Sequence, residues 1–525
     1  MPLNFLTWLL ALLPVLTIII LMFAFNWGGT RAGALGWIVA VVVAVLAFGA
    51  GWRLLAYAQV KSILLSTDVL LIIWTALLLY NIANQAGAIR IIGERLPTLT
   101  SDRVMQVLLV SWLLVSFIQG MGGFGVPIAV CAPILVAMGF SPLQAVVMAA
   151  LGHGWGVNFG SMATAFQALM AVTGLPAETL APLTALFLGA ASLPSGMIVA
   201  YLGTGWQGLK KGFPAIMILS LVMGVTQYFL ATNNLYILAT TGAAMAGMLV
   251  CLFLLRLPMY HAAPAPEHTA ASSLAHPEKP RSFLVSVSAY VILVVIGFFV
   301  SLVKPVNQLL NQVRLNTQFP ALSTSLGWQT PAEAGRAISI FGHPGMILLY
   351  ACLISYGIYR YAGYLNGNDT KQILGKVYKS GITASLAVIS MVSMATIMNH
   401  SGMINLLARG ISESVSRALY PAVAPFLGVL GAFITGSNNN SNVLFGVLQM
   451  ETARLLDLPI PLILAAQTAG GSLGSIMSPA KVIVGCSTVG LVGKEAGALR
   501  KIILFGLIPV ALVAILSTIF ALGLI

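Results

Sequence analysis

Six consecutive polar residues, Ser437 to Asn442, interrupt a stretch of sequence that is otherwise apolar. A glycine-rich segment, Gln119 to Pro127, interrupts an earlier apolar stretch. We expect neither segment to continue as a helix in lipid, because glycine and Asx residues favour tight turns and left-handed backbone. Such breaks leave backbone N–H groups free at the tips of half-helices, where the positive end of the helix dipole attracts anions. Both breaks can therefore bind a carboxylate without an arginine.

Each break also has a purely structural explanation. Glycines such as Gly122 and Gly123 can serve only to let helices pack closely, and for these two residues both explanations stay open. Six polar side chains in a row at membrane depth need protein or water partners, which favours a binding role for Ser437 to Asn442.

More polar side chains stand in the apolar segments that follow the two breaks. Their hydroxyl and amide groups can bind the hydroxyl or carboxylate of a substrate, although Asn158 and Thr468 can equally join two helices. Lys481 is costly in an uncharged segment and is by default a functional residue, unless it reaches an interface from the end of its helix. The predicted substrate-binding residues are Gln119, Gly120, Gly122, Gly123, Phe124, Gly125, His153, Asn158, Ser437, Asn438, Asn439, Asn440, Ser441, Asn442, Gln467, Ser472, Ser475, Ser478 and Lys481.

Few titratable groups stand near these residues. His153, His400 and Asp68 are the candidates for proton coupling, since a histidine pKa can move across physiological pH. A buried neutral histidine with one hydrogen bond is the alternative for His153 and His400. No pair of carboxylates suggests acid–base hydrolysis, and the histidines of the Pro-rich segment 258–282 are too irregularly spaced for a metal site. We therefore expect no catalytic residue, no metal and no cofactor.

The elements that position these residues are membrane helices. Of the 525 residues, 59% are hydrophobic and 7% are charged, which leaves too few polar residues to cover a water-soluble fold. The 25 Lys and Arg exceed the 12 Asp and Glu, but they lie in short connections between apolar runs. This is the positive-inside pattern, so nucleic acid is not the expected partner. The composition predicts an all-α integral membrane protein.

At about 20 apolar residues per span, the sequence predicts 12 to 14 transmembrane helices. They are expected near residues 4–25, 33–51, 64–86, 104–120, 142–170, 179–201, 213–231, 235–256, 283–303, 341–362, 380–399, 417–436, 459–484 and 502–525. The Pro-rich stretch 258–282 is expected to be a polar linker.

The chain also contains an internal repeat. The pattern N-x-x-G-x-I begins at Asn84 and again at Asn399, 315 residues later. The pattern Phe-Ile-x-Gly begins at Phe117 and again at Phe433, 316 residues later. Paired, interrupted hydrophobic segments at corresponding positions point to the binding site of a secondary transporter.

We expect two structural repeats, inverted relative to one another, each with a re-entrant hairpin and an interrupted helix. The interrupted helix of the first repeat is expected to contain Gly152 to Gly160, and that of the second repeat Gly470 to Gly474. The expected organisation is N-terminal spans over 1–60, a first repeat over 61–257 with its hairpin near 119–140, the linker 258–282, and a second repeat over 283–525 with its hairpin near 436–457.

The motifs resemble those of the L-lactate permease family, proton-coupled carriers of lactate and glycolate, over most of the chain. The resemblance implies a divergent member of a larger ion-transporter superfamily, with a transport domain that moves against a scaffold. It also implies a multi-pass protein of the plasma membrane, a bacterial-type inner membrane. The motifs that carry it are Gly123 to Ile128, His400 to Gly402, Gly436-Ser437 with Ser441-Asn442 and Leu444-Phe445, Ser478-Pro479, and Val489 to Glu495.

The chain departs from the family at positions that bear on coupling. Gln119 stands where the family usually has a glutamate, and Asn438 where it usually has an aspartate. Ser475 stands where the family has a lysine, while Lys481 appears six residues later. Gly152 to Trp155 replaces an Asn-Thr-Ala-Pro stretch of the family and introduces a histidine.

The sequence therefore predicts a secondary active transporter of small organic anions, of the lactate or glycolate 2-hydroxymonocarboxylate type, with proton coupling. The alternative is a different or more highly charged anion, by exchange or altered coupling, because losing two carboxylates makes the site more positive. A channel or a membrane enzyme is less favoured. The expected partners are a small organic anion, a proton or another coupling ion, and the lipid bilayer; a homodimer stays open.

Overall fold

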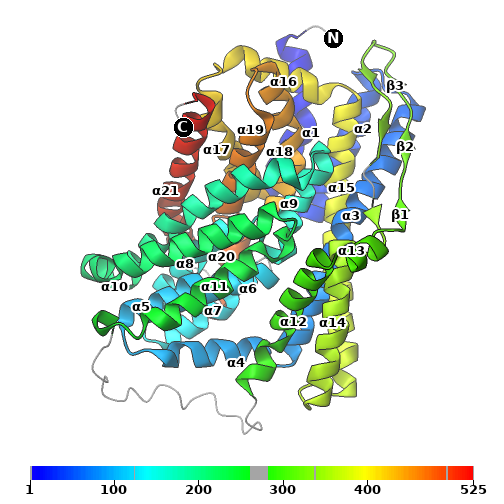
Figure 1. Ribbon diagram of the computed structural model, residues 1–525. Helices are drawn as coiled ribbons and strands as arrows, with labels where there is room; N and C mark the ends of the chain where they lie inside the picture. Colours follow the sequence, from blue (N-terminus) through cyan, green and yellow to red (C-terminus); the bar gives the residue numbers. More distant parts are fainter. Residues whose placement is uncertain are drawn as a thin grey trace.

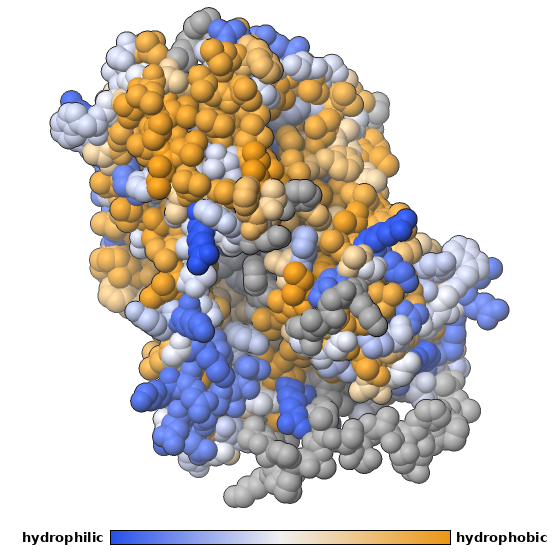
Figure 2. Space-filling view, turned by 180° about the vertical axis from the view of Figure 1, so that it is seen from behind, coloured by the Kyte–Doolittle hydropathy of each residue, from blue (hydrophilic) through white to orange (hydrophobic). Residues whose placement is uncertain are grey.

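The protein is described by a computed structural model over residues 3–25, 27–122, 125–260, 282–335, 338–491 and 495–523. Most of these residues are helical (Figure 1). Within these ranges nine helices are long and apolar enough to cross a membrane, and three shorter apolar helices accompany them. Figure 2 shows hydrophobic residues over the upper and middle part of one face of the molecule. The expected all-α membrane protein is confirmed.

The helices follow one another closely along both halves of the chain. Those of the first half are α1 (Phe5–Phe23), α2 (Gly29–Leu46), α3 (Trp52–Gln85), α4 (Ala88–Arg95), η1 (Leu96–Leu99), α5 (Arg103–Leu108), η2 (Leu109–Leu114), α6 (Val115–Met121), α7 (Val126–Ala137), α8 (Pro142–His153), η3 (Gly154–Gly156), α9 (Gly160–Thr173), α10 (Ala177–Thr232), η4 (Tyr236–Leu238), α11 (Ala239–Leu254) and η5 (Pro258–Tyr260). Those of the second half are α12 (Phe283–Leu302), α13 (Lys304–Leu310), α14 (Pro344–Tyr361), α15 (Gly367–His400), α16 (Met403–Ser414), α17 (Tyr420–Thr435), α18 (Asn438–Leu455), α19 (Ile460–Ser475), α20 (Pro479–Thr488) and α21 (Glu495–Ala521).

Helices α3 and α15 occupy corresponding places in the repeat and run in opposite directions. Each has 34 residues, and the second starts 315 residues after the first. Gln85, at the end of α3, donates a 2.8 Å hydrogen bond to Asp369 near the start of α15. Gln59, near the start of α3, donates a 3.0 Å bond to Ser393 near the end of α15. This antiparallel pairing is what inverted repeats require.

The helices pack into two groups. Helices α1, α2, α3, α12, α14 and α15 form one group, which we call the scaffold. Helices α5 to α11 and α17 to α21 form the other, which we call the hairpin bundle. The short amphipathic helices α4 and α16 connect them along the chain. The groups meet where α9 and α18 contact α3 and α15, so a site between these helices can change when one group moves.

The expected interruption of the first repeat falls between α8 and α9. Helix α8 starts with Pro142 and is capped by reciprocal hydrogen bonds between Ser141 and Gln144. After it ends, the backbone enters a left-handed turn from Ser161 to Ala163, with φ values of 47, 57 and 60°. Non-glycine residues rarely adopt this conformation, and each costs about 1–2 kcal/mol, so neighbouring contacts must hold it.

The expected interrupted helix of the second repeat is formed by α19 and α20. Gly470 to Gly474 are helical, and the break falls at 476–478, between α19 and α20. The glycines serve close packing: a Cβ at Gly470 would lie 1.9 Å from the carbonyl oxygen of Pro425 in α17. The interrupted helix predicted to contain these glycines is therefore present, and the glycines themselves let a neighbouring backbone approach closely.

Helix α10 joins two of the expected spans, 179–201 and 213–231, without a loop. Its 56 residues are kinked at Gly205, whose φ of 69° and ψ of −168° are open only to glycine. At 1.5 Å per residue the whole element would be about 84 Å long, so it counts as two spans.

A strand segment between α13 and α14 was not expected from the sequence. It consists of β1 (Arg314–Leu315), β2 (Gln318–Phe319) and β3 (Leu322–Ser323), paired with β6 (Ile338–Ser339), β5 (Glu333–Ala334) and β4 (Gln329–Thr330). Together the pairs form one long antiparallel hairpin beside α2 and α3, along the right edge of Figure 1. Ser325 at its tip donates backbone and hydroxyl hydrogen bonds to the Gly49 carbonyl, which attaches the hairpin to the scaffold.

Candidate functional site

Four buried side chains from both repeats meet at the centre of the hairpin bundle. Asn158, in the break between α8 and α9, accepts hydrogen bonds from Asn438 Nδ2 at 3.1 Å and from Thr468 Oγ1 at 2.6 Å. Asn442, one turn after Asn438 in α18, donates to Thr468 Oγ1 at 2.8 Å and to the Ala165 carbonyl at 2.9 Å. The first turn of α18 is therefore fastened to the broken helix of the other repeat.

Helix α19 presents a stripe of hydroxyl groups toward the same break. Thr468, Ser472 and Ser475 have i, i+4 and i+7 spacing, which places them on one face of the helix. Ser472 accepts a 3.0 Å hydrogen bond from the backbone N–H of Asn158 and donates a 2.8 Å bond to the Gly154 carbonyl. These bonds satisfy backbone groups that the interruption leaves without helical partners.

Lys481 lies at the far end of this stripe. Its Nζ donates a 3.1 Å hydrogen bond to Ser475 Oγ, and its side chain is 2% exposed. The alternative that Lys481 reaches an interface is therefore excluded. No acidic side chain within the described ranges forms an ion pair with it. His153, fully buried, lies near enough to interact electrostatically with Lys481, and its Nδ1 contacts the Ala149 carbonyl at 2.7 Å.

Several polar atoms around the break have no partner among the described residues. A buried polar atom without a partner costs about 1–3 kcal/mol, so each of these atoms can gain from a bound ligand. The atoms are Gln119 Oε1, His153 Nε2, Asn158 Nδ2, Asn438 Oδ1 and Asn442 Oδ1.

The polar run Ser437 to Asn442 is helical from Asn438, so the predicted break is present but is shorter than the run. The true break is Gly436, which has a left-handed φ of 71°. The side chains of the run point to different sides of α18. Ser441 donates to the Gly428 carbonyl at 2.8 Å, while Asn440 lies beside Gly29 of α2. Asn439 is only partly buried. Amides in the first helical turn find partners on neighbouring helices, which the sequence alone does not reveal.

The first hairpin contributes less side-chain chemistry. Gln119, at the end of α6, lies against the break, since a Cβ at Gly160 would come within 2.7 Å of Gln119 Nε2. Gly120 and Gly122 pack against Thr241 and Tyr80, which supports their structural explanation. Gly125 caps α7 with a φ of 85° and packs against Val484 of α20, near Lys481 along the chain. Gly123 and Phe124 lie outside the described residues.

Gln467 belongs to a second polar chain that the sequence analysis did not find. It accepts a 3.0 Å hydrogen bond from Gln449, which in turn accepts a 2.6 Å bond from the hydroxyl of Tyr420. These residues connect α17, α18 and α19. A lone glutamine in the apolar end of α18 was the available signal for Gln449.

The other predicted residues are dispersed. Ser478 stands at the N-cap position of α20. His400 lies at the end of α15, in the scaffold, where its Nε2 is 4.0 Å from Glu333 Oε1. Asp68 lies midway along α3. In the described part of the chain no cluster of three His, Cys, Asp or Glu residues could hold a metal ion.

The family model and the relatives found by sequence point to one family. The family model described as L-lactate permease matches residues 7–523. Glycolate permease GlcA of Escherichia coli (strain K12) is 26% identical, covering 97% of this chain and 94% of that protein. L-lactate permease of Salmonella typhimurium is 28% identical, covering 85% of this chain and 83% of that protein. Among solved structures, the YdaH transporter of Alcanivorax borkumensis is 14% identical with a TM-score of 0.46, and covers 86% of this chain and 84% of that one.

The relatives are named permeases, which are transporters and not enzymes, and the many apolar helices of this chain fit a multi-pass membrane protein. The match extends over nearly the whole chain, including both hairpins and both interrupted helices. The chain therefore belongs to the L-lactate permease family and is a multi-pass transporter of the bacterial plasma membrane.

Proposed function

We propose that this protein is a secondary active transporter of small 2-hydroxymonocarboxylates of the lactate and glycolate type. The observation that carries the proposal is Lys481, a buried cation with a hydroxyl partner and no acidic partner in the described structure. A buried charge is stable only when an opposite charge compensates it. A substrate carboxylate supplies that charge, and the names of the lactate and glycolate permeases support the same chemical class.

The hydroxyl stripe of α19 gives the substrate further partners. Thr468 and Ser475 are seven residues apart, or about 10 Å along the helix axis. A lactate ion is shorter than this distance, so it exchanges one partner for the next as it moves from Lys481 toward Asn158 and Asn438. The unpaired amide atoms of Asn158 and Asn438 provide a donor and an acceptor for the substrate hydroxyl.

Proton coupling in this proposal uses His153. Gln119 and Asn438 cannot release a proton, whereas His153 is buried near Lys481 and has a free Nε2 atom. A proton on His153 beside Lys481 favours binding of an anion, and a bound anion favours the proton. Linkage makes the two effects equal, so proton and carboxylate cross together.

A dianion is the second candidate. Lys481 is buried without an acidic partner among the described residues, and His153 with its unpaired Nε2 lies beside it, which is the observation in favour of a dicarboxylate. The movement that carries either anion is a displacement of the hairpin bundle, which contains the polar break, against the scaffold.

The test is uptake of labelled L-lactate and glycolate into proteoliposomes, with and without an inward proton gradient, and with unlabelled monocarboxylates and dicarboxylates as competitors. Saturable uptake, stimulated by the gradient and inhibited by monocarboxylates, is expected. Competition by dicarboxylates alone would favour the second candidate. Absence of saturable uptake of any of these acids would contradict the proposal.

A further inference from the structure

A separate cavity of about 390 Å³ lies between the scaffold and the hairpin bundle. Its walls come from α3 and α15 on one side and from the ends of α9 and α18 on the other, and the strand hairpin covers it. This volume lies in the range of cavities that hold small ligands. Polar side chains enter it from three elements, with Lys61 on α3, Thr396 and Asn399 on α15, and Glu333 on β5.

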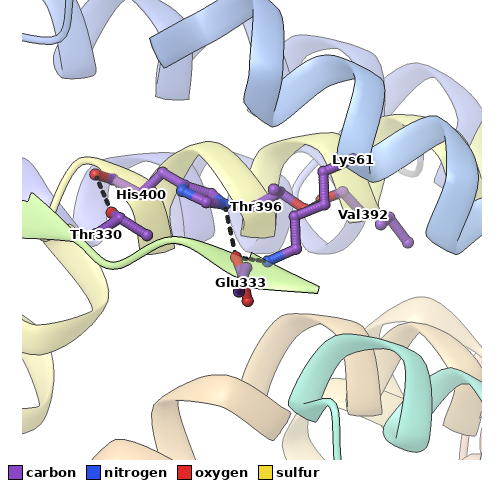
Figure 3. A network of polar contacts seen from close by, with 6 residues as sticks. All are labelled: Lys61, Thr330, Glu333, Val392, Thr396 and His400. Carbon is purple, nitrogen blue, oxygen red and sulfur yellow. Dashed lines mark hydrogen bonds and ion pairs between the residues drawn. The ribbon is translucent and has the colours of Figure 1, made fainter. Parts of the chain in front are cut away.

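The charged groups of this cavity are paired with one another. Lys61 Nζ donates to Glu333 Oε1, an ion pair that bridges helix α3 and strand β5 (Figure 3). The side chains are 16% and 38% exposed, so the pair faces the cavity and is only partly desolvated. Ion pairs of this kind contribute little net stability. A carboxylate that enters the cavity can therefore replace Glu333 at small cost.

A buried histidine adds a second observation. His400 is 2% exposed, and neither of its ring nitrogens has a hydrogen-bond partner among the described residues. Figure 3 shows its ring directed toward Glu333, and Nε2 lies 4.0 Å from Glu333 Oε1. Nε2 is too far from Glu333 for a good hydrogen bond, so it keeps a donor available for an oxygen that takes the place of the Glu333 carboxylate.

The cavity lies close to the central polar residues. Met450 of α18 lines the cavity and lies eight residues after Asn442, about 12 Å along the same helix. Thr173 of α9 lines it too, eight residues after Ala165, whose carbonyl accepts from Asn442. The same two helices thus carry both sites, and a ligand in the cavity is about two helical turns from the central cluster.

The cavity lies near the end of α15, away from the basic residues at the beginning of that helix. His400 ends α15, whereas Arg360 to Lys379 surround the beginning of that helix. Basic connections mark the cytoplasmic side of membrane proteins, so the cavity belongs to the outer side.

We propose that this cavity is an outer carboxylate-binding site, in which Lys61 and His400 bind the carboxylate of the incoming substrate. Before the substrate arrives, the carboxylate of Glu333 forms the ion pair with Lys61, and the substrate displaces it. The inference rests on the proposed function for the identity of the carboxylate, but the site itself is defined by its own residues. Release of Glu333 also frees strand β5 from α3, which loosens the cover of the cavity as the ligand arrives.

The first test compares Glu333→Gln with the unmodified protein in L-lactate uptake. Removing the competing charge is expected to lower KM about two- to five-fold, the range of a partly exposed ion pair, with little change in Vmax. Lys61→Met is expected to raise KM, Lys61→Arg to restore it, and Glu333→Gln to have no effect in the Lys61→Met background. Asp457→Asn is the matched control, because it removes an exposed ion pair with Arg417 and neither residue lines the cavity. An unchanged or raised KM in Glu333→Gln, or an effect that persists without Lys61, would overturn the proposal.

The second test needs neither variants nor transport. Hydrogen exchange of residues 329–335 is measured in the purified protein with L-lactate, glycolate, acetate or malonate, against chloride at equal ionic strength. At least one carboxylate is expected to accelerate exchange in this segment, since it releases Glu333. No acceleration by any of the four acids would overturn the outer site. Failure of lactate and glycolate uptake together with accelerated exchange would reject the proposed function and leave the outer site standing.

Discussion

The two hairpins occupy corresponding places in the inverted repeats but provide different chemistry. The first, between α6 and α7, ends in glycines and continues in an entirely apolar helix from Val126 to Ala137. The second, between α17 and α18, continues in a helix whose first turn carries four amides and a serine. The first hairpin offers Gln119 and backbone, whereas the second offers Asn438 and Asn442 to the central break. The repeat thus preserves the shape of the site while its side-chain chemistry is concentrated in one half.

The close-packing glycines behave in the opposite way and are matched in both halves. A Cβ at Gly152 would lie 1.6 Å from the Ser111 carbonyl oxygen, and one at Gly470 would lie 1.9 Å from that of Pro425. The two glycines are 318 residues apart, close to the offset of the repeat. Symmetry is therefore kept where backbones touch and lost where a ligand would bind, which separates the structural residues from the functional ones.

Replacing Lys481 tests the functional side of this comparison and has the largest expected effect. Lys481→Met removes the buried charge that compensates a substrate carboxylate, so L-lactate kcat/KM in proteoliposomes is expected to fall about 30-fold or more. Lys481→Arg retains the charge and should keep part of the activity. Lys210→Met, on an exposed lysine of α10, is the control and should leave uptake unchanged. Uptake by Lys481→Met at the control level would remove Lys481 from the site.

Alanine at the matched glycines tests the structural side. Gly152→Ala and Gly470→Ala each force a methyl group onto a neighbouring carbonyl, so both are expected to lower the free energy of unfolding by about 1–3 kcal/mol. The measurement is thermal unfolding in detergent, and Gly357→Ala is the control because nothing lies within 4 Å of its Cβ position. A large loss in only one of the two variants would break the symmetry that the distances indicate.

The sequence predicted the positions of most helices and the two elements that meet at the site, because long apolar runs and their breaks are local features. It also placed Asn158 and Ser472 in corresponding interrupted segments, and the structure brings them together at 3.0 Å. It did not predict that Asn438 is helical, because the same polar residue types are common both in loops and at the starts of helices. A helix that is buried on all sides has no amphipathic periodicity, so the sequence does not show which of its faces points toward which neighbour. The hydrogen bond between Gln449 and Tyr420 could therefore not be predicted.

The strand hairpin was missed for a different reason. Its strands are two residues long, too short for alternation of polar and apolar residues to be recognised. Glu333 therefore looked like a loop residue, and its pairing with Lys61 depends on contacts 272 residues apart. Interactions that join distant parts of the chain depend on packing and cannot be inferred from spacing.

Restoring a carboxylate in each hairpin sharpens the comparison between them. Asn438→Asp replaces the amide that donates to Asn158 Oδ1. At neutral pH the new carboxylate has no proton to donate and faces the lone pairs of that oxygen. L-lactate uptake is therefore expected to fall about tenfold. Uptake should recover as the pH falls, because the protonated acid again has a donor. Gln119→Glu is the matched variant in the first hairpin and should have a smaller effect. Equal losses in both variants would mean that the two hairpins share the chemistry evenly.

The hydrogen-bonded chain Tyr420–Gln449–Gln467 is polar and buried in the second half of the protein, yet we expect it to stabilise helix packing and not to bind substrate. Its variants should therefore have the smallest effect on uptake. Tyr420→Phe removes the donor of the 2.6 Å hydrogen bond to Gln449 and leaves the ring in place. The free energy of unfolding is expected to fall by about 1 kcal/mol, with uptake per folded molecule unchanged. Tyr378→Phe, on an exposed side of α15, is the control for loss of a hydroxyl. A change in KM for L-lactate in Tyr420→Phe would extend the binding region beyond α18 and α19. Buried polar residues throughout the second half would then have to be regarded as functional.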